Sequence, residues 1–96
     1  MTDEPKIVDF DAGEDWGAEV IQLDHPFRLK GVVYSAFTMR TPSGLDVTRF
    51  YVDAERSIPN FAIGLIGVDS VVFAKLHGDD AAKIVDKARN FLFKAP

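Results

Sequence analysis

The chain has no cysteine, which excludes disulfide bonds and thiolate-bound metal ions. It also has no apolar run near the roughly 18 residues that a membrane-spanning helix requires. Its first residues, MTDEPKIVDFDAGEDWG, lack the basic start and the apolar stretch of a secretory signal peptide. These absences predict a cytoplasmic protein without a membrane partner.

Motifs for catalysis and cofactor binding are missing as well. The sequence has no G-x-S-x-G turn, no H-x-x-x-H pair, no calcium-binding loop and no glycine-rich phosphate loop. The two imidazoles are those of His25 and His77. The segment His77-Gly78-Asp79-Asp80 offers one nitrogen and two carboxylates, but a helix start explains Asp79 as its N-cap and Asp80 as a first-turn acid. We therefore predict no catalytic residue, no cofactor and no metal site, and we do not expect an enzyme.

Charge is unevenly distributed over the 96 residues. Residues 1–19 carry seven acids against Lys6, a balance of −6, whereas the remainder carries +2. Such an acidic arm argues against a nucleic-acid partner, because phosphate backbones bind positive surfaces. We predict a flexible acidic arm over residues 1–18, although its apolar residues leave open a docking segment for another chain. Residues 19–94 have the length of a single compact domain.

Two antiparallel strands are predicted over residues 19–41. Apolar side chains alternate there, as in a strand with one buried face. These apolar residues all stand at odd-numbered positions, namely Ile21, Leu23, Phe27, Val33, Phe37 and Met39. A three-residue loop over 29–31 keeps all of them on one face, with Leu23 opposite Phe37 and a glycine at the left-handed position. A two-residue loop puts Leu23 opposite Thr38 and mixes the faces, so we favour the longer loop.

Two residues of the first strand have particular roles in this register. His25 faces Ser35 on the inner face, where a hydrogen-bonded histidine is expected rather than a metal ligand. Pro26 cannot donate a hydrogen bond, which predicts an edge strand or a bulge at that point.

Residues 43–94 are predicted to form three to four short helices, of which the last is the longest. Ser43 begins the first helix as its N-cap, with Asp46 three residues further on, and the helix runs to about residue 56. Its β-branched residues lose rotamer freedom in a helix, so a strand over 47–52 is the alternative.

The other helices are predicted from the residues that typically begin and end a helix. One begins near Pro59 and ends at Gly67, a short one follows Asp69 and stops at Gly78, and the last is capped by Asp79. The last helix has apolar residues at spacings of three and four, namely Ala81, Ile84, Val85, Ala88, Phe91 and Leu92. The fold class is therefore α+β, with an N-terminal antiparallel hairpin followed by helices.

Four short motifs occur in order between Val20 and Leu92. They are Leu23-Asp24-His25-Pro26 leading to Gly31, then Met39-Arg40-Thr41-Pro42 with Asp46, then Leu65-Ile66-Gly67-Val68, and last Leu76 with Asp79-Asp80 before a helix that closes on Phe91-Leu92. Their order and spacing resemble the small tail assembly chaperones of Mu-like and related contractile-tailed phages. The resembling part covers about three-quarters of the chain.

The resemblance implies a non-enzymatic protein that acts in the host bacterial cytoplasm during phage or prophage virion assembly. Members of this family are thought to coat the long, aggregation-prone tape measure protein and to help recruit tail tube subunits, which would be the partners here. The positions that match the family motifs are Pro26, Gly31, Arg40, Pro42, Asp46, Gly67, Asp80 and Phe91. We interpret them as structural, with Arg40 and Asp46 linking the end of a strand to the start of a helix.

The aromatic content favours a protein-binding role. Eight Phe, one Trp and two Tyr are many for a core of this size, and surplus aromatic residues often mark a partner surface. We predict that two helices border a groove for an amphipathic client helix, and that the groove residues are Phe50, Tyr51, Phe61, Leu65 and Ile66. One alternative is a dimerising adaptor in which the hairpin edge pairs with a second copy. Another is a small enzyme or ligand binder with a histidine in its pocket.

Overall fold

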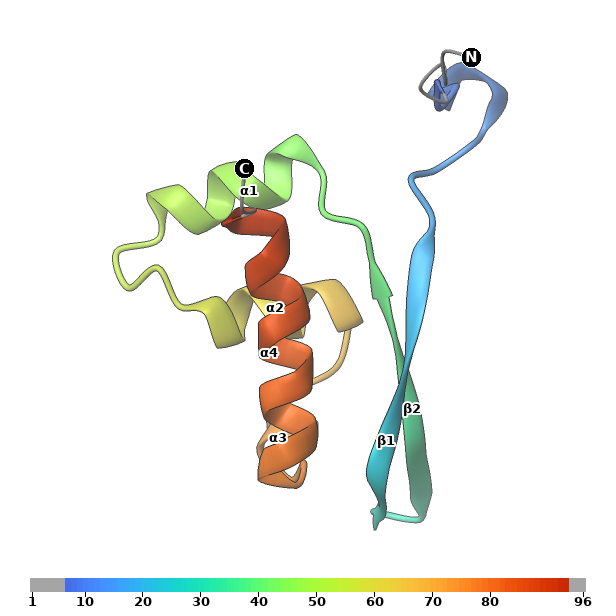
Figure 1. The fold of residues 1–96 in the computed structure, drawn as a ribbon, viewed down its shortest axis with the longest axis vertical. Helices are drawn as coiled ribbons and strands as arrows, with labels where there is room; N and C mark the ends of the chain where they lie inside the picture. Colours follow the sequence, from blue (N-terminus) through green and yellow to red (C-terminus); the bar gives the residue numbers. More distant parts are fainter. Residues whose placement is uncertain (1–6, 94–96) are drawn as a thin grey trace, which may run out of the picture.

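The computed structural model describes residues 7–93, and its elements confirm the α+β fold class (Figure 1). Two antiparallel strands come first, β1 (Ala18–Leu29) and β2 (Val32–Arg40). Within the described range four helices follow, α1 (Gly44–Val52), α2 (Ile58–Ile66), α3 (Ser70–Ala74) and α4 (Gly78–Leu92). The helices gather on one side of the hairpin, and α4 is the longest, as the sequence predicts.

The turn of the hairpin has two residues, not the three that the sequence predicted. Leu29 pairs with Val32, and the residues between them, Lys30 and Gly31, both have positive φ, at 50° and 80°. Positive φ at both central positions is typical of a type I′ turn, whose twist matches that of the flanking strands. The predicted loop over 29–31 is therefore wrong.

The pairing of the strands shifts between Gln22 and Phe27. Near the turn Phe27 pairs with Tyr34, whereas farther along Gln22 pairs with Ala36. Four residues of β1, 23–26, thus lie opposite Ser35 alone, so β1 contains three extra residues. Because successive side chains of a strand point to opposite faces, an odd number of extra residues in β1 reverses which residues of the two strands share a face. The apolar side chains of both strands therefore share the inner face beyond the bulge. The predicted pairs Ile21–Met39, Leu23–Phe37 and Phe27–Val33 are wrong, although the buried face that they were meant to explain is largely present.

A buried aspartate of α4 holds this bulge. The carboxylate of Asp80 is fully buried and accepts the backbone N–H groups of Asp24, at 2.9 Å, and His25, at 3.0 Å. Because the bulge has no regular cross-strand partners, these N–H groups need another acceptor. Burial acts to raise the pKa of Asp80, but the two N–H bonds and the nearby Lys83 ammonium outweigh it and lower that pKa.

The bulge also changes which side chains face the core. His25 has no paired residue in β2 and is exposed, so the predicted His25–Ser35 pair on the inner face is wrong. Tyr34 stacks on Phe27 at 5.1 Å between ring centroids and packs against the core, where the odd-numbered pattern placed Val33. Val33 is exposed in its place. Pro26 lies within the bulge, which confirms that prediction.

Residues 47–52, for which the sequence allowed either a helix or a strand, belong to a helix. Ser43 caps α1, because its hydroxyl accepts the Asp46 N–H and the Asp46 carboxylate accepts the Ser43 N–H in return. This capping box begins the helix despite the β-branched residues that follow. The helix ends at Val52, four residues earlier than predicted, and Asp53 after it is extended.

The remaining helices begin and end close to the predicted positions, with two corrections. Ser57 caps α2, and Gly67 ends it in the left-handed conformation with φ 68°. Asp69 caps α3, which ends at Ala74 rather than at Gly78. The cap of α4 is His77, whose Nδ1 accepts the N–H of Asp79, so the predicted Asp79 cap is wrong.

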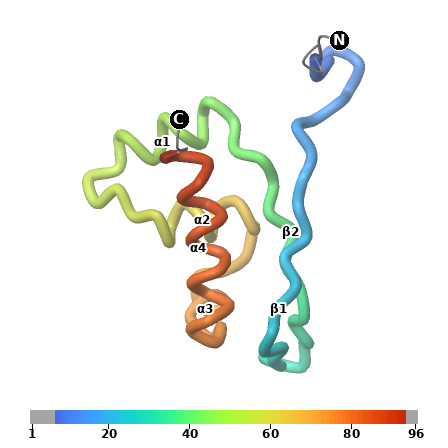
Figure 2. The backbone as a smooth tube through the Cα atoms, viewed as in Figure 1, coloured from blue at the N-terminus to red at the C-terminus, as the bar shows by residue number. Residues whose placement is uncertain are grey.

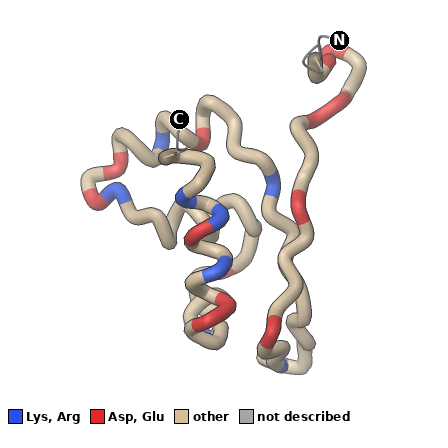
Figure 3. The backbone as a smooth tube through the Cα atoms, viewed as in Figure 1, with Lys and Arg blue, Asp and Glu red and all other residues tan. Residues whose placement is uncertain are grey.

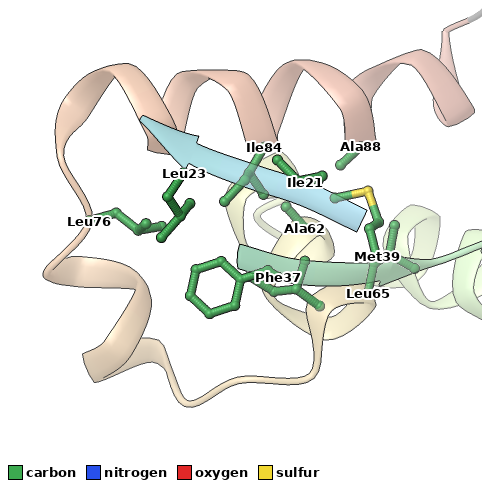
Figure 4. Close-up of a cluster of buried hydrophobic side chains, with 10 residues drawn as sticks. Ile21, Leu23, Phe37, Met39, Ala62, Leu65, Leu76, Ile84 and Ala88 are labelled. Atoms are coloured by element: carbon green, nitrogen blue, oxygen red, sulfur yellow. The ribbon is translucent and has the colours of Figure 1, made fainter. Parts of the chain in front are cut away.

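The core lies between the inner face of the hairpin and the helices α2 and α4 (Figure 4). Its fully or nearly fully buried residues come from these three parts and from the segment between α3 and α4, and are Ile21, Leu23, Phe37, Met39, Ala62, Leu65, Ile66, Leu76, Ile84 and Ala88. A two-stranded sheet is marginal in water by itself. The helices therefore stabilise the hairpin by covering its apolar face.

The arm before β1 extends away from the helices (Figure 2). Of the predicted arm, residues 1–6 lie outside the described part. The rest contains a 3-10 turn, Phe10–Ala12, and an edge-to-face contact of 5.2 Å between Phe10 and Trp16, both of which are exposed. The arm contributes to a radius of gyration of 15.3 Å, larger than the ~12–13 Å of a compact chain of this length. Across residues 7–93, no helix combines the length and apolar character that crossing a bilayer demands.

Candidate partner-binding groove

A groove lies between α1 and α2, where the sequence predicted one. It has a volume of about 350 Å³. Its apolar lining comes from Phe50 of α1 and from Phe61, Gly64 and Leu65 of α2. Polar side chains from both helices and the segments beside them form the rest of the lining, namely Arg40, Asp46, Arg49, Asp53, Ser57 and Asn60. An apolar floor with a polar rim is the usual form of a surface that binds another protein.

Aromatic contacts connect the two helices beside the groove. The ring of Phe50 meets that of Phe61 edge-to-face at 5.7 Å and that of Tyr51 at 5.2 Å. Phe93, just after α4, lies 6.4 Å from Phe50 and is exposed. These contacts fix the position of α1, which otherwise has little buried surface, since Phe50 is its one buried residue.

The five residues predicted to bind a partner divide into two groups. Phe50, Phe61 and Leu65 line the groove. Tyr51 is exposed beside it, 47% accessible, without lining it. Ile66 is buried in the core and does not line the groove.

An ion pair forms one wall of the groove. The guanidinium of Arg40 donates to both carboxylate oxygens of Asp46, at 2.5 and 2.8 Å. This bidentate hydrogen bonding lowers the pKa of Asp46 well below its usual range, assisted by the Ser43 N–H and opposed by burial, and it raises the pKa of Arg40. The pair joins the end of β2 to the first turn of α1, which confirms the predicted structural link.

The other family-motif positions are structural in this fold as well. Gly31 and Gly67 have positive φ, and Pro42 precedes the cap of α1. Pro26 and Asp80 belong to the bulge and its anchor, and Phe91 packs against the core. None of these lines the groove.

Two features of the described residues escaped sequence analysis. Gly64 and Asn60 line the groove, but an isolated glycine and asparagine in a helix carry no signal for that. His25, His77 and Asp79 come together at the base of α4 because the bulge in β1 brings His25 there. Nothing in the sequence indicates a contact between side chains 52 positions apart.

Comparisons with family models, curated proteins and solved structures found no match to this chain. The features of the chain that bear on function are therefore the groove, the exposed apolar residues and the order of motifs.

Proposed function

We propose that this protein is a phage or prophage tail assembly chaperone that binds a helical segment of the tape measure protein in the α1–α2 groove. In this role it acts without catalysis, in the host bacterial cytoplasm, and tail tube subunits are a further partner. The observation that carries the proposal is the groove itself, which has an aromatic floor and lies at the surface of a small domain. The order of motifs from Val20 to Leu92 supports the choice of family.

The shape of the groove suits an amphipathic helix. Helices that dock in grooves insert apolar side chains at spacings of three and four into a hydrophobic floor. Phe50, Phe61 and Leu65 offer such a floor, and Tyr51 and Leu45 are further exposed apolar residues of α1. Charges of both signs, Arg49 and Asp53, stand at the rim, where they can pair with the polar face of the client.

The acidic arm suits a chaperone that keeps its client dispersed. Acidic positions follow the arm and the start of β1, whereas α4 carries both signs (Figure 3). An excess of one charge keeps complexes apart by mutual repulsion. The arm therefore serves solubility in this proposal, while the groove serves recognition.

Gly64 offers a test that blocks the groove without disturbing the fold. A side chain added there would project into open space, since no atom lies within 4 Å of its Cβ position. In Gly64→Gln we expect loss of binding to tape measure fragments, because the new side chain fills the groove. The helix itself should gain roughly 0.5–1 kcal/mol in stability, because Gly is a poor helix former.

Co-purification of the chain with overlapping tape measure fragments measures the binding, and thermal unfolding measures the stability. Ala82→Gln is the matched control, since it adds the same side chain at an exposed position of α4. Binding by the native chain and by this control, but not by Gly64→Gln, supports the proposal. Absence of binding by the native chain at micromolar concentration contradicts it.

A dimerising adaptor is the second candidate, favoured by the outer face of the hairpin. The sheet of the described chain has two strands, so each strand presents one unpaired edge. Val20 and Val33 are more than half exposed on the outer face. Such edges pair readily with another strand. A dimer in sedimentation that Val33→Lys dissociates, together with no affinity for tape measure fragments, would favour the adaptor.

A further inference from the structure

Two histidines and an aspartate converge where the bulge of β1 meets the start of α4. The rings of His25 and His77 stack with centroids 3.7 Å apart and planes 18° from parallel. One oxygen of the Asp79 carboxylate lies 3.6 Å from Nε2 of His25 and 3.7 Å from Nδ1 of His77. A ligand atom from each of the three residues lies within 4.8 Å of the other two.

These separations are close to those between ligands of one metal ion. With zinc–ligand bonds of about 2.0–2.1 Å, neighbouring ligand atoms of a tetrahedral site lie about 3.3–3.4 Å apart. The two nitrogen–oxygen separations need to shorten by only a few tenths of an ångström. Both imidazoles are about half exposed, so their rings can turn toward a common ion and leave positions for water.

The backbone positions of the three residues are fixed independently of any ion. Asp80 accepts the N–H of His25 and so holds the bulge against α4. His77 and Asp79 are two residues apart at the start of α4, so the chain itself keeps them together. Asp80 lies outside the ligand set, and support of this kind orients the residues of metal sites.

We propose that His25, His77 and Asp79 bind one divalent transition-metal ion, of the class that includes Zn²⁺, Co²⁺ and Ni²⁺. Imidazole nitrogens with one carboxylate suit these ions, whereas Ca²⁺ and Mg²⁺ prefer oxygen ligands. The bound ion joins β1 to the start of α4 and stabilises that junction. It exchanges the capping hydrogen bond of His77 for a coordination bond, so we expect a site of moderate affinity.

The local charge favours a cation. Three carboxylates lie in or beside the cluster, those of Asp79, Asp24 and Asp80. Lys83 is a cation that contacts two of them, at 3.2 Å from Asp24 and 3.7 Å from Asp80. The carboxylates therefore outnumber the nearby cations among the described contacts. A positive ion at this place reduces the mutual repulsion of the acids.

Titration of the untagged 96-residue chain with Zn²⁺ by calorimetry tests the site, and Co²⁺ absorption reports its ligands. We expect one ion per chain, a visible Co²⁺ spectrum with imidazole coordination, and a higher melting temperature when Zn²⁺ is added. His25→Asn and Asp79→Asn should each weaken binding by at least about ten-fold, a loss seen even when outer-shell partners of metal sites are removed. His77→Asn keeps a side-chain oxygen for the cap and should weaken binding similarly.

Asp24→Asn is the matched control, because it removes a neighbouring carboxylate outside the cluster. Its effect should stay within about two-fold, since exposed charges are screened by salt. No binding at millimolar Zn²⁺ overturns the proposal. Binding that persists unchanged in His25→Asn also overturns it, because it assigns the ion to other acids such as those of the arm. Neither outcome bears on the groove, so the two proposals stand or fall separately.

Discussion

Two aspartates of this chain have different structural roles because their surroundings differ. Asp46 is partly buried at the surface, where it pairs with Arg40 and caps a helix. Asp80 is fully buried and accepts two backbone N–H groups of the bulge. In both cases the hydrogen bonds to the charged form lower the pKa, so both carboxyls are ionised in the folded protein at neutral pH.

Asp46→Asn should lower the free energy of unfolding at neutral pH by about 1 kcal/mol, the scale of a half-exposed ion pair combined with a weakened cap. Because folding lowers the pKa of Asp46, its contribution is complete above the ordinary pKa of 3.8 and is lost as the pH falls through the folded value. The difference in the free energy of unfolding between native chain and variant should therefore shrink as the pH falls from 3.8 towards the pKa of the folded state. Urea unfolding at several pH values measures it.

Arg40→Gln is the control for this prediction, because it removes the ion pair and leaves the hydrogen bonds between Asp46 and Ser43 in place. Its loss of stability should be smaller than that of Asp46→Asn. An Asp46→Asn difference that stays constant down to strongly acid pH would show that the charge of Asp46 contributes nothing to stability.

At the scale of elements, the contacts of β1 with α4 determine the form of the hairpin. The two-residue turn alone would direct Leu23 away from the core, and the three extra residues of the bulge return it. The bulge in turn depends on α4, since its N–H groups are accepted by Asp80. Strand and helix therefore stabilise each other, and neither has this form without the other.

Asp80→Asn should destabilise the protein more than Asp46→Asn does. An amide has one oxygen, so one N–H of the bulge loses its acceptor and meets an NH₂ group inside the protein. Thermal unfolding measures the loss, and hydrogen exchange of the Asp24 and His25 amides locates it. Asp86→Asn, at an exposed position of the same helix, should leave the melting temperature nearly unchanged. Equal melting temperatures for the Asp80 and Asp86 variants would show that the bulge holds without this carboxylate.

The whole molecule consists of a packed body and an arm that contacts it little. Within the described residues the arm makes its aromatic contact internally, between Phe10 and Trp16, and joins the body through a hydrogen bond from Thr41 N–H to the Gly17 carbonyl. The body leaves apolar side chains at its surface on α1 and on the outer face of the hairpin. These surfaces are where a second polypeptide would bind.

Trp16 is the single tryptophan and is 52% exposed, so its fluorescence should report the arm and not the core. We expect its emission maximum to change little through the thermal transition that circular dichroism detects. A Trp16→Phe, Phe91→Trp variant provides the control, because residue 91 packs against the core and its emission should shift with unfolding. A large red shift of Trp16 in step with the loss of helix would show that the arm packs on the body.

The sequence by itself determined the helices, because their caps are local. The caps act within one turn of chain, and those that the sequence predicted are present at Ser43 with Asp46, at Asp69 and at Gly67. The link between Arg40 and Asp46 spans six residues and was also predictable. Three of the five expected groove residues line the groove, because an apolar stripe on each helix indicates its inner side.

Tertiary structure alone decided the features that join distant residues. The two-residue turn is compatible with one buried face only because the bulge in β1 brings the apolar residues of both strands to the same side. The bulge in turn requires a hydrogen-bond acceptor from a helix more than fifty residues away. The same contact brings His25 to His77 and Asp79. Local patterns do not contain this information, because a backbone N–H that loses its strand partner can donate to any suitably placed oxygen, and only the assembled fold shows which oxygen is there.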